Sequence, residues 1–295
     1  QDLISDGIFT GILRKNSHKS IFMQKINFIK MHGLGNDFVI IDKRVNKITI
    51  TKELISKLSD RKSGAGCDQL ITINNSSEKD NDIDAEIKIY NPSGDQAEAC
   101  GNGTRCVAKL LFEELNKNNI KILSDAGILV ATQKDKNISV NLGKLTTNWK
   151  KIPMTKDMDT MNVPIKINDF SNGVAVNVGN PHLVFFGQNI NDVDLGNIGP
   201  DIENHKFFPN KVNVELVEII NRNKIKIRVW ERGAGLTLAC GSGACASVYA
   251  GKLKNLLEND VEVILERGSL YINIVNDEAI MTGPAEISFY GSLDC

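Results

Sequence analysis

Two short segments of the chain place a cysteine immediately before a glycine-rich turn that leads into a helical pattern. The first is Ala99-Cys100-Gly101-Asn102-Gly103 and the second is Ala239-Cys240-Gly241-Ser242-Gly243. The apolar residues that follow recur every three or four positions, which predicts amphipathic helices starting near Thr104 and near Ala244. A thiol at a helix N-terminus lies beside unpaired backbone N–H groups, a setting that lowers its pKa from ~8.5 toward neutrality. The sequence therefore predicts the same activated thiol twice.

The similarity between the two halves of the chain extends beyond the cysteines. Cys100 and Cys240 are 140 residues apart, and other polar positions recur at offsets of 140 or 144. These pairs are Asn91 with Glu231, Asn36 with Asn180, and Gln69 with Asn213. Several anchors at nearly constant spacing indicate an internal duplication. Two homologous halves that fold alike would bring two like sites together across their interface.

Two equivalent thiols are suited to the inversion of a stereocentre without a cofactor. A thiolate removes the α-proton from one face of the substrate, and a thiol on the other side delivers a proton to the opposite face. Backbone N–H groups beside the cysteines, at Gly101 and Asn102 and at Gly241 and Ser242, are free to bind a carboxylate. Such donors also stabilise the negative charge that develops in an α-carbanion. A disulfide oxidoreductase, in contrast, would carry both cysteines on one motif.

The predicted elements are mainly strands, many of which alternate apolar and polar residues as a half-buried sheet requires. The expected strands cover residues 38–42, 69–73, 86–90, 127–133, 137–142, 174–178, 182–186, 212–220, 224–230, 260–265 and 269–274. Apart from the two helices after the cysteines, a shorter helix is predicted near Lys52–Ser59. We therefore expect an α+β fold in which a mostly antiparallel sheet or barrel wraps around a central helix, repeated twice.

The chain of 295 residues has room for two domains of ordinary size. A polar stretch at about 143–155 is the expected boundary. We expect residues 23–142 to form an N-terminal domain and residues 143–284 a C-terminal domain. A last strand at about 285–295 is expected to return to the first domain, and residues 1–22 are expected to be a poorly ordered extension.

Composition excludes several classes of partner. The net charge of −1, with both signs interspersed, argues against nucleic acid and against an anionic membrane surface. No apolar run approaches the ~20 residues that a membrane span needs. The first 22 residues lack a basic segment followed by an apolar stretch, so they are a poor secretory signal. These features favour a small-molecule substrate.

The remaining cysteines do not indicate a metal site or a disulfide framework. Cys106 and Cys245 fall on the apolar stripes of the predicted helices and are expected in the core. Their spacing from Cys100 and Cys240 does not suit zinc, so we expect no metal. Cys67 and Cys295 have no assigned role.

The chain resembles a known family at the residues that carry this chemistry. Matching segments occur in the same order, namely MHGLGNDFV (31–39), GCDQL (66–70), YNPSGDQAEACGNGTRC (90–106), GNPH (179–182), VN (212–213) and WERGAGLTLACGSGAC (230–245). They resemble segments of diaminopimelate epimerase and cover nearly the whole chain from about Lys25. The resemblance implies two pseudo-symmetric domains with the active site in the cleft between them. It also implies interconversion of LL- and meso-2,6-diaminopimelate without a cofactor, on the route to lysine and peptidoglycan, by a cytoplasmic homodimer.

The resemblance further implies roles for individual residues. Cys100 and Cys240 would be the acid–base pair, and the backbone at Gly101, Asn102, Gly241 and Ser242 would hold the reacting carboxylate. The substrate pocket would be lined by Asn36, Gln69, Asn91, Asn180, Asn213, Glu231 and Arg232. Arg232 can bind the distal carboxylate bidentately, and Glu231 can accept from the reacting amino group as part of the catalytic set. His182 either tunes a thiol, as the resemblance suggests, or is a hydrogen-bonded structural residue.

Two other functions are compatible with a pair of cysteines. A proline-racemase-like enzyme uses two cysteines, but its substrate has no second ammonium, which would leave Glu231 and Arg232 without a rationale. A non-enzymatic module could use Cys100 and Cys240 to bind a metal or to undergo redox chemistry.

Overall fold

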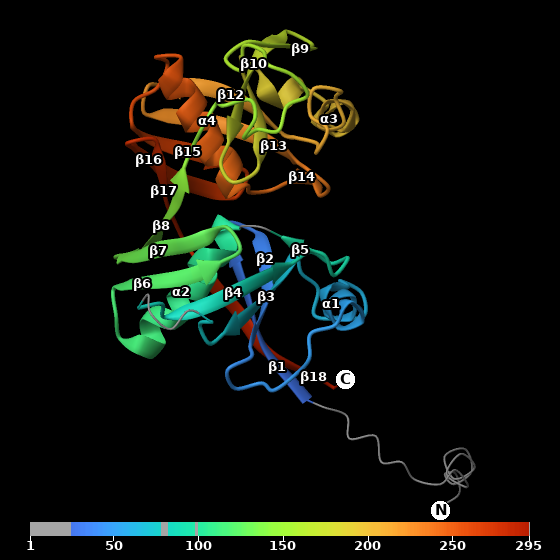
Figure 1. Ribbon diagram of the computed structural model, residues 1–295, viewed down its shortest axis with the longest axis vertical. Helices are drawn as coiled ribbons and strands as arrows, with labels where there is room; N and C mark the ends of the chain where they lie inside the picture. The colour runs from blue at the N-terminus through green and yellow to red at the C-terminus, as the bar shows by residue number, and fades with distance from the viewer. Residues whose placement is uncertain (1–24, 78–81, 98–99, 295) are drawn as a thin grey trace, which may run out of the picture.

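Alternating apolar and polar residues give strands with one buried face, and these strands form two lobes, one above the other in Figure 1. The computed structural model describes residues 25–77, 82–97 and 100–294. The expected extension at residues 1–22 and Cys295 lie outside the described residues. All of the strands expected from the sequence are present, and the few helices and many strands confirm the α+β class.

The N-terminal lobe is a curved sheet with two helices. Its strands are β1 (Lys25–Gly33), β2 (Asn36–Asp42), β3 (Gln69–Asn74), β4 (Ala85–Tyr90), β5 (Gln96–Ala97), β6 (Asn119–Ser124), β7 (Gly127–Lys134), β8 (Asn137–Lys144) and β18 (Glu286–Asp294). Its helices are α1 (Lys52–Ser59), as predicted, and α2 (Gly101–Leu115). Hydrogen-bonded neighbours follow the order β18-β1-β2-β3-β4-β6-β7-β8, with parallel pairs only at β2–β3 and β4–β6 among the described residues.

The C-terminal lobe repeats this plan. Its strands are β9 (Val163–Ile167), β10 (Phe170–Asn177), β11 (Pro181–Phe186), β12 (Asn213–Asn221), β13 (Lys224–Glu231), β14 (Gly235–Thr237), β15 (Asp260–Leu265), β16 (Gly268–Val275) and β17 (Glu278–Gly283). Its helices are a 3-10 turn, η1 (Ile190–Asp192), then α3 (Leu195–Glu203) and α4 (Gly241–Leu253). The parallel pairs, β11–β12 and β13–β15, occupy the same places in the order as their N-terminal counterparts. The internal duplication predicted from the sequence is therefore visible in the topology.

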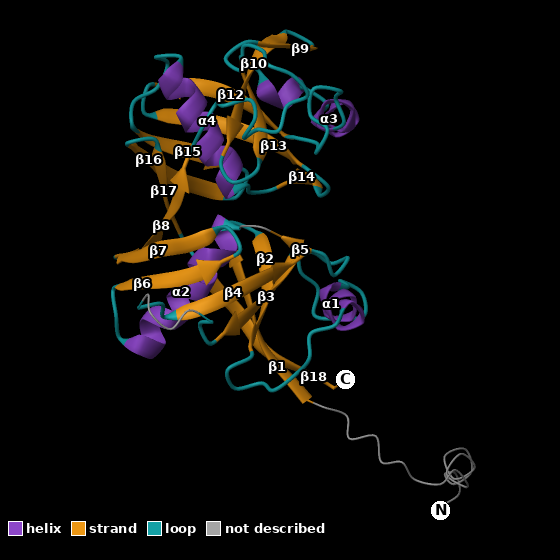
Figure 2. Ribbon diagram, viewed as in Figure 1, coloured by secondary structure: helices purple, strands orange, loops and turns teal. Residues whose placement is uncertain are grey.

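One strand pairing and one crossing of the chain connect the lobes. β8 pairs with β17, which makes the two sheets continuous. The chain then crosses back, and β18 pairs with β1, so that Asp294 lies opposite Lys25 near the two ends of the described chain. Both pairings are antiparallel; the β8–β17 pairing lies between the lobes, whereas the β1–β18 pairing lies within the N-terminal lobe (Figure 2).

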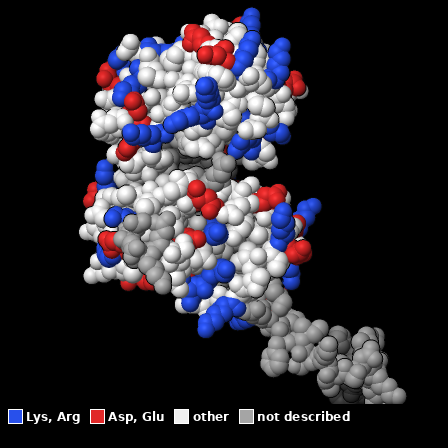
Figure 3. Space-filling view, viewed as in Figure 1, with Lys and Arg blue, Asp and Glu red and all other residues white. Residues whose placement is uncertain are grey.

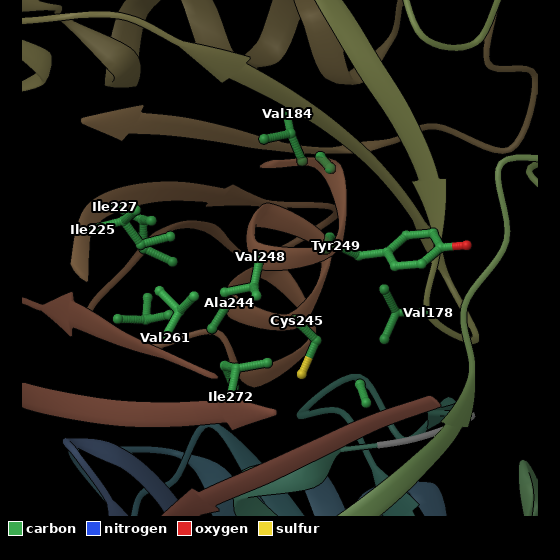
Figure 4. Close-up of a cluster of buried hydrophobic side chains, with 14 of the residues drawn as sticks. Val178, Val184, Ile225, Ile227, Ala244, Cys245, Val248, Tyr249, Val261 and Ile272 are labelled. Carbon is green, nitrogen blue, oxygen red and sulfur yellow. The ribbon is translucent and has the colours of Figure 1, made fainter. Parts of the chain in front are cut away.

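A helix runs through the centre of each lobe. α2 packs against β1, β2, β6, β7 and β8, and α4 packs against strands from β10 to β17. Cys106 and Cys245 are fully buried, as predicted, and Cys245 lies in the apolar cluster drawn in Figure 4. The expectation that the second helix is amphipathic is wrong, because residues 243–251 of α4 are all buried. A helix surrounded by sheet on all sides has no face for polar residues.

Both central helices begin earlier than predicted, and the predicted starts near Thr104 and Ala244 are wrong. α2 begins at Gly101 and α4 at Gly241, so the glycine-rich segments are the first helical turns rather than separate loops. Helix α3 was not predicted, since it contains glycines and Pro200, which have poor helix propensity. Gly199 is required there because a Cβ would lie 2.4 Å from the Trp230 ring.

Within the described residues, no helix is long and apolar enough to cross a membrane.

Candidate active site

A cavity of about 1540 Å³ lies between the lobes and is lined by residues of both. Most of the residues singled out from the sequence line it, namely Asn36, Gln69, Asn91, Cys100, Gly101, Asn102, Asn180, Glu231, Arg232, Cys240, Gly241 and Ser242. His182 and Asn213 do not line the cavity and are buried behind its wall. The fold thus assembles residues that are up to 206 positions apart in the chain, from Asn36 to Ser242.

Each cysteine is the N-cap residue of its helix. Cys100 and Cys240 have extended backbone conformations, and their sulfur atoms accept hydrogen bonds from the amides of Gly103 at 3.5 Å and Gly243 at 3.4 Å. This is the position that a serine or aspartate oxygen commonly takes at a helix N-terminus. The first-turn amides have no partner within the helix, so both helix ends present donors beside a thiol.

The starts of the two helices meet across one side chain. A Cβ on Gly101 would lie 2.4 Å from the terminal methyl of Met281, and a Cβ on Gly241 would lie 2.7 Å from its sulfur. A Cβ at either position would force the Met281 side chain to move, so glycine at both positions lets Met281 lie between the helix ends as it does. The glycines after the cysteines therefore serve close packing between lobes as well as access to backbone amides.

A chain of amide side chains connects the first cysteine to the opposite lobe. The Cys100 thiol lies 3.8 Å from Oδ1 of Asn36, which also accepts a hydrogen bond from Asn102 Nδ2 at 3.1 Å. Asn102 Nδ2 also lies 3.4 Å from the carbonyl oxygen of Ala239, the residue before the second cysteine. The fully buried Arg105 donates to Oδ1 of Asn102 at 2.9 Å, which holds the amide in this orientation.

The turn between β13 and β14 presents Glu231 and Arg232 to the cavity. Oε1 of Glu231 accepts from the Thr237 hydroxyl at 2.5 Å. The backbone of Arg232 is fixed by a 2.8 Å hydrogen bond from its amide to Oδ1 of Asn213, which explains how Asn213 contributes without lining the cavity. Glu203, on α3, accepts from the Gly233 amide at 3.1 Å and from the Trp230 indole N–H at 2.8 Å, so it supports the same turn.

The N-terminal lobe presents amides at the equivalent place. Nε2 of Gln69 donates to Oδ1 of Asn91 at 3.0 Å. Asn36 donates from Nδ2 to Asp68 at 2.9 Å, and Arg61 binds both Asp68 and Asp37 at 2.7 Å. A charged network thus holds the strand ends that carry Asn36 and Gln69.

Burial affects the pKa values of the two thiols more than the helix N-termini do. It raises the pKa of Cys100 to about 11, and the Gly103 amide offsets this only in part. Burial also raises the pKa of Cys240 well above the ordinary value, and the charges of Glu231 and Glu215 raise it further. The expectation that both thiols have lowered pKa values is therefore wrong for the protein without substrate. Desolvation of the thiolate outweighs the donors at the helix N-termini.

Glu231 is itself affected by the enclosed site. Burial raises its pKa, and hydrogen bonds from Thr237 and Cys240 counteract the rise. Its charge in turn raises the pKa of both thiols. In this enclosed space, ionisation of the Glu231 carboxylate therefore disfavours ionisation of either thiol.

His182 is a fully buried residue with both ring nitrogens engaged. Nδ1 lies 2.7 Å from Oε1 of Glu215, and Nε2 lies 2.8 Å from Oδ1 of Asn180. Glu215 also packs under the start of α4, because a Cβ on Gly243 would lie 2.8 Å from its Oε1. Through these contacts His182 orients Asn180, which lines the cavity.

Three residues of this arrangement were missed by sequence reasoning. Arg105, Glu203 and Glu215 are buried, and each acts on a cavity residue from behind. Glu215 lies in a stretch of β12 that is buried on both faces, so strand alternation carries no signal for it. Arg105 directly follows the first glycine-rich turn, and that proximity is the one sequence feature that could have drawn attention to it.

Among the described residues, no group of three or more His, Cys, Asp or Glu side chains is arranged to hold a metal ion. Cys67, Cys100, Cys106, Cys240 and Cys245 are free thiols. On the face drawn in Figure 3, basic and acidic side chains are interspersed over both lobes.

Comparison with known proteins relates this site to one family. The family model for diaminopimelate epimerase matches residues 28–147 and 174–288. The diaminopimelate epimerase of Pelagibacter ubique is 47% identical over 266 residues, which cover 88% of this chain and 95% of the relative. That of Zymomonas mobilis is 41% identical, covering 91% of this chain and 97% of the relative.

Solved structures share the fold at low identity. A phenazine biosynthesis protein of the PhzF family from Bacillus anthracis has a TM-score of 0.67 at 15% identity, covering 92% of this chain and 100% of its own. A hydroxyproline epimerase from Agrobacterium vitis has a TM-score of 0.64 at 12% identity, covering 92% of this chain and 93% of its own. The identity and coverage of the sequence relatives, together with the family match, show that this chain belongs to the diaminopimelate epimerase family, and so to the isomerases.

Proposed function

We propose that this chain interconverts LL- and meso-2,6-diaminopimelate, for lysine and peptidoglycan precursor synthesis, by a two-base mechanism without a cofactor. The observation that carries the proposal is the pair of cysteine-capped helix N-termini that line one cavity between the lobes. A carboxylate bound by the amides at both helix ends would place the neighbouring α-carbon between the two sulfur atoms.

The proposed reaction is balanced by the two cysteines alone. The thiolate of one cysteine takes the α-hydrogen as a proton and becomes a thiol, and the electron pair delocalises into the carboxylate. The helix-end amides stabilise the resulting enediolate. The thiol of the other cysteine then gives its proton to the opposite face of the carbon and becomes a thiolate. Proton exchange with solvent after product release restores the starting form.

The raised thiol pKa values suggest when the thiolate forms. Glu231 raises the pKa of both Cys100 and Cys240 through its negative charge. A substrate ammonium bound against Glu231 would cancel this charge and favour ionisation of a thiol. In this proposal the substrate itself completes the catalytic site, and the empty protein keeps its thiols protonated.

Arg232 is proposed to bind the distal carboxylate. Its guanidinium lines the cavity and donates one hydrogen bond, from Nη1 to the carbonyl oxygen of Asn210 at 3.1 Å. The other guanidinium donors have no partner among the described residues. Glu231 and Arg232 together would then recognise one ammonium and one carboxylate, which a substrate such as proline cannot offer at once.

The division into domains near residue 143 is proposed to have a functional basis. Each lobe carries one of the two cysteines that cap a central helix, and the last strand returns to β1. Domains limited to residues 23–142 and 143–284, joined by this returning strand, would allow the two cysteines to approach a substrate from opposite sides. We further propose that the protein works in the cytoplasm, since the reaction needs both thiols reduced.

We also propose that the protein is a homodimer. β18 pairs with β1 on one side, and among the described strands no other strand covers its second edge. Phe289 and Tyr290 on this strand are 48% and 69% exposed. An uncovered edge strand with exposed aromatic side chains is a favourable surface for association with a second copy.

The two-base proposal predicts that each cysteine is essential. Cys100→Ala and Cys240→Ala each remove one proton-transfer group, so turnover of diaminopimelate in either direction should fall at least a thousandfold. Turnover is measured by deuterium incorporation at the α-carbon and by chromatographic separation of the isomers. Cys245→Ala, a change in the core away from the cavity, should keep most of the activity. Turnover near the wild-type rate in either active-site variant would refute the proposal.

The pKa of Cys100 predicts slow alkylation of the empty protein. A thiolate is the reactive form, and a pKa of about 11 leaves roughly one thiol in a thousand ionised at pH 8. In the Cys240→Ala variant, the rate of carbamidomethylation at Cys100 should rise about tenfold per pH unit from pH 7 to pH 10. Mass spectrometry of the labelled peptide gives the rate. A plateau below pH 9 would show that the thiol is already activated without substrate.

Replacement of Arg232 tests recognition of the distal carboxylate. Arg232→Lys keeps the charge but loses the planar fork, and charged hydrogen bonds of this kind contribute about 1.5–3 kcal/mol each. The KM for diaminopimelate should rise at least tenfold. Arg228→Lys, on β13 just before the turn that carries Arg232 but bonded to the carbonyl oxygens of Ile190 and Val193, is the matched control and should leave the KM unchanged. An unchanged KM in Arg232→Lys would mean that the distal carboxylate binds elsewhere.

The dimer proposal predicts a particle of twice the 32.5 kDa chain mass in analytical ultracentrifugation. Tyr290→Asp introduces a charge into the proposed contact and should shift the equilibrium to monomers at micromolar concentration. Tyr271→Asp alters a tyrosine that is 51% exposed on β16 and should leave the mass unchanged. A wild-type protein that sediments as a monomer at all concentrations would contradict the proposal.

A further inference from the structure

Arg105 is a buried cation with no acidic partner among the described residues. Its side chain is 0% exposed and lies under the starts of both central helices. Three neutral acceptors bind its guanidinium: Nη2 donates to Asn102 Oδ1 at 2.9 Å, Nε to the Pro284 carbonyl at 3.2 Å, and Nη1 to Met281 Sδ at 3.2 Å. A buried charge without a counter-ion is costly for folding, so its retention needs a reason beyond stability.

Two glycines in the surrounding backbone leave room for the guanidinium of Arg105. A Cβ on Gly33 would lie 2.9 Å from Nη2 of Arg105, and a Cβ on Gly283 would lie 3.3 Å from its central carbon. Burial lowers the pKa of Arg105, but arginine starts so high that it keeps its proton. The positive charge is therefore permanent and held at one place.

The guanidinium lies close to the first turn of α2 and to the Cys100 thiol, where negative charge develops during the proposed reaction. It is one hydrogen bond from Asn102, whose backbone amide belongs to the first turn of α2. Its other contact, Met281, lies between Gly101 and Gly241 at the two helix ends. The titratable groups that act on Arg105 are three thiols, of which Cys100 belongs to the site, and Glu231 on β13 acts on Cys100 in turn.

The charge balance of the loaded site requires such a cation. During the proposed reaction, the site holds the substrate carboxylate, Glu231 and one thiolate, against a single ammonium near the reacting carbon. His182 and Glu215 form a separate buried pair behind the wall. Two negative charges in an enclosed, low-dielectric space repel strongly, and a fixed positive charge beneath them reduces the repulsion.

We propose that Arg105 is a positioning residue whose buried charge acts as the permanent counter-ion of the active site, stabilising the thiolate of Cys100 and the enediolate above the helix ends. The inference rests on the proposed function for the identity of the reaction. Its effect on Cys100 is independent of any substrate, so a failure of either proposal can be recognised separately.

The first test measures the reactivity of Cys100 in the Cys240→Ala background without substrate. Arg105→Met removes the charge at similar length, and the rate of carbamidomethylation at Cys100 should fall at least tenfold at every pH between 7 and 10. Arg105→Lys keeps a charge at this place, and the rate should stay within about threefold of the parent. An equal loss of the alkylation rate in Arg105→Met and Arg105→Lys would overturn the proposal. The hydrogen bonds of the guanidinium, and not its charge, would then control the reactivity of Cys100.

Lys109 provides a matched control on the same helix. Its ammonium donates to the Ala285 carbonyl at 3.2 Å, next to the Pro284 carbonyl that Arg105 binds. Lys109→Met breaks an equivalent hydrogen bond between α2 and the segment that joins β17 to β18. It removes no charge beneath the cysteines. Cys100 should react at the parental rate in this variant. A tenfold lower alkylation rate in Lys109→Met would show that the hydrogen bonds to the segment between β17 and β18, rather than the charge of Arg105, control the reactivity of Cys100.

Arg105→Gln covers the case in which Arg105→Met does not fold, because a glutamine keeps a donor for Asn102 while it removes the charge. It should slow alkylation as strongly as Arg105→Met, and a rate within threefold of the parent would overturn the proposal. With diaminopimelate as substrate and both cysteines present, the neutral variants should lower kcat at least a hundredfold and change KM less than fivefold. A loss confined to KM would contradict a role in stabilising the reacting charges.

Discussion

The close approach of two helix N-termini is the constraint on which the rest of the structure depends. α2 and α4 belong to different lobes, yet their first turns meet across Met281, and glycine at positions 101 and 241 is what permits the contact. The returning strand β18 and the β8–β17 pairing hold the lobes in this arrangement. Because a helix N-terminus carries unpaired amides, two of them brought together would form the strong anion site of the proposed reaction, between two thiols.

The same enclosure that strengthens the anion site suppresses the thiolates. Burial raises the pKa of Cys100 to about 11, and Glu231 raises it further. The protein therefore needs positive charge to be reactive, and two sources are at hand in our proposals. Arg105 supplies a permanent charge beneath the helices, and a substrate ammonium supplies a second one above them. Reactivity is then coupled to occupancy, which protects the thiols of the empty protein from side reactions.

The two lobes share a plan but differ in what they present to the cavity. Each contributes a cysteine at the start of a buried helix. Around it, the N-terminal lobe offers the neutral pair Gln69 and Asn91, whereas the C-terminal lobe offers Glu231 and Arg232. In the proposed reaction, symmetric proton transfer by the two cysteines would be combined with asymmetric recognition of the substrate. Such a division suits a substrate that exchanges protons on both faces of one carbon and whose distal end extends to one side only.

The sequence by itself determined most of the strands, the duplication and the two cysteines, because these depend on local periodicity and on spacing along the chain, whereas β1, β5, β6, β9, β14 and β17 were not predicted. The tertiary structure decided the rest. The glycine-rich segments proved to be helical turns, and α4 lacked a polar face, since both properties arise from packing against the whole sheet. The thiol pKa values were raised rather than lowered because desolvation depends on burial by residues distant in sequence. The place of Arg105 is set by Met281 on β17 and by Pro284, between β17 and β18, which lie beneath α2 although they are 176 and 179 positions away in the chain.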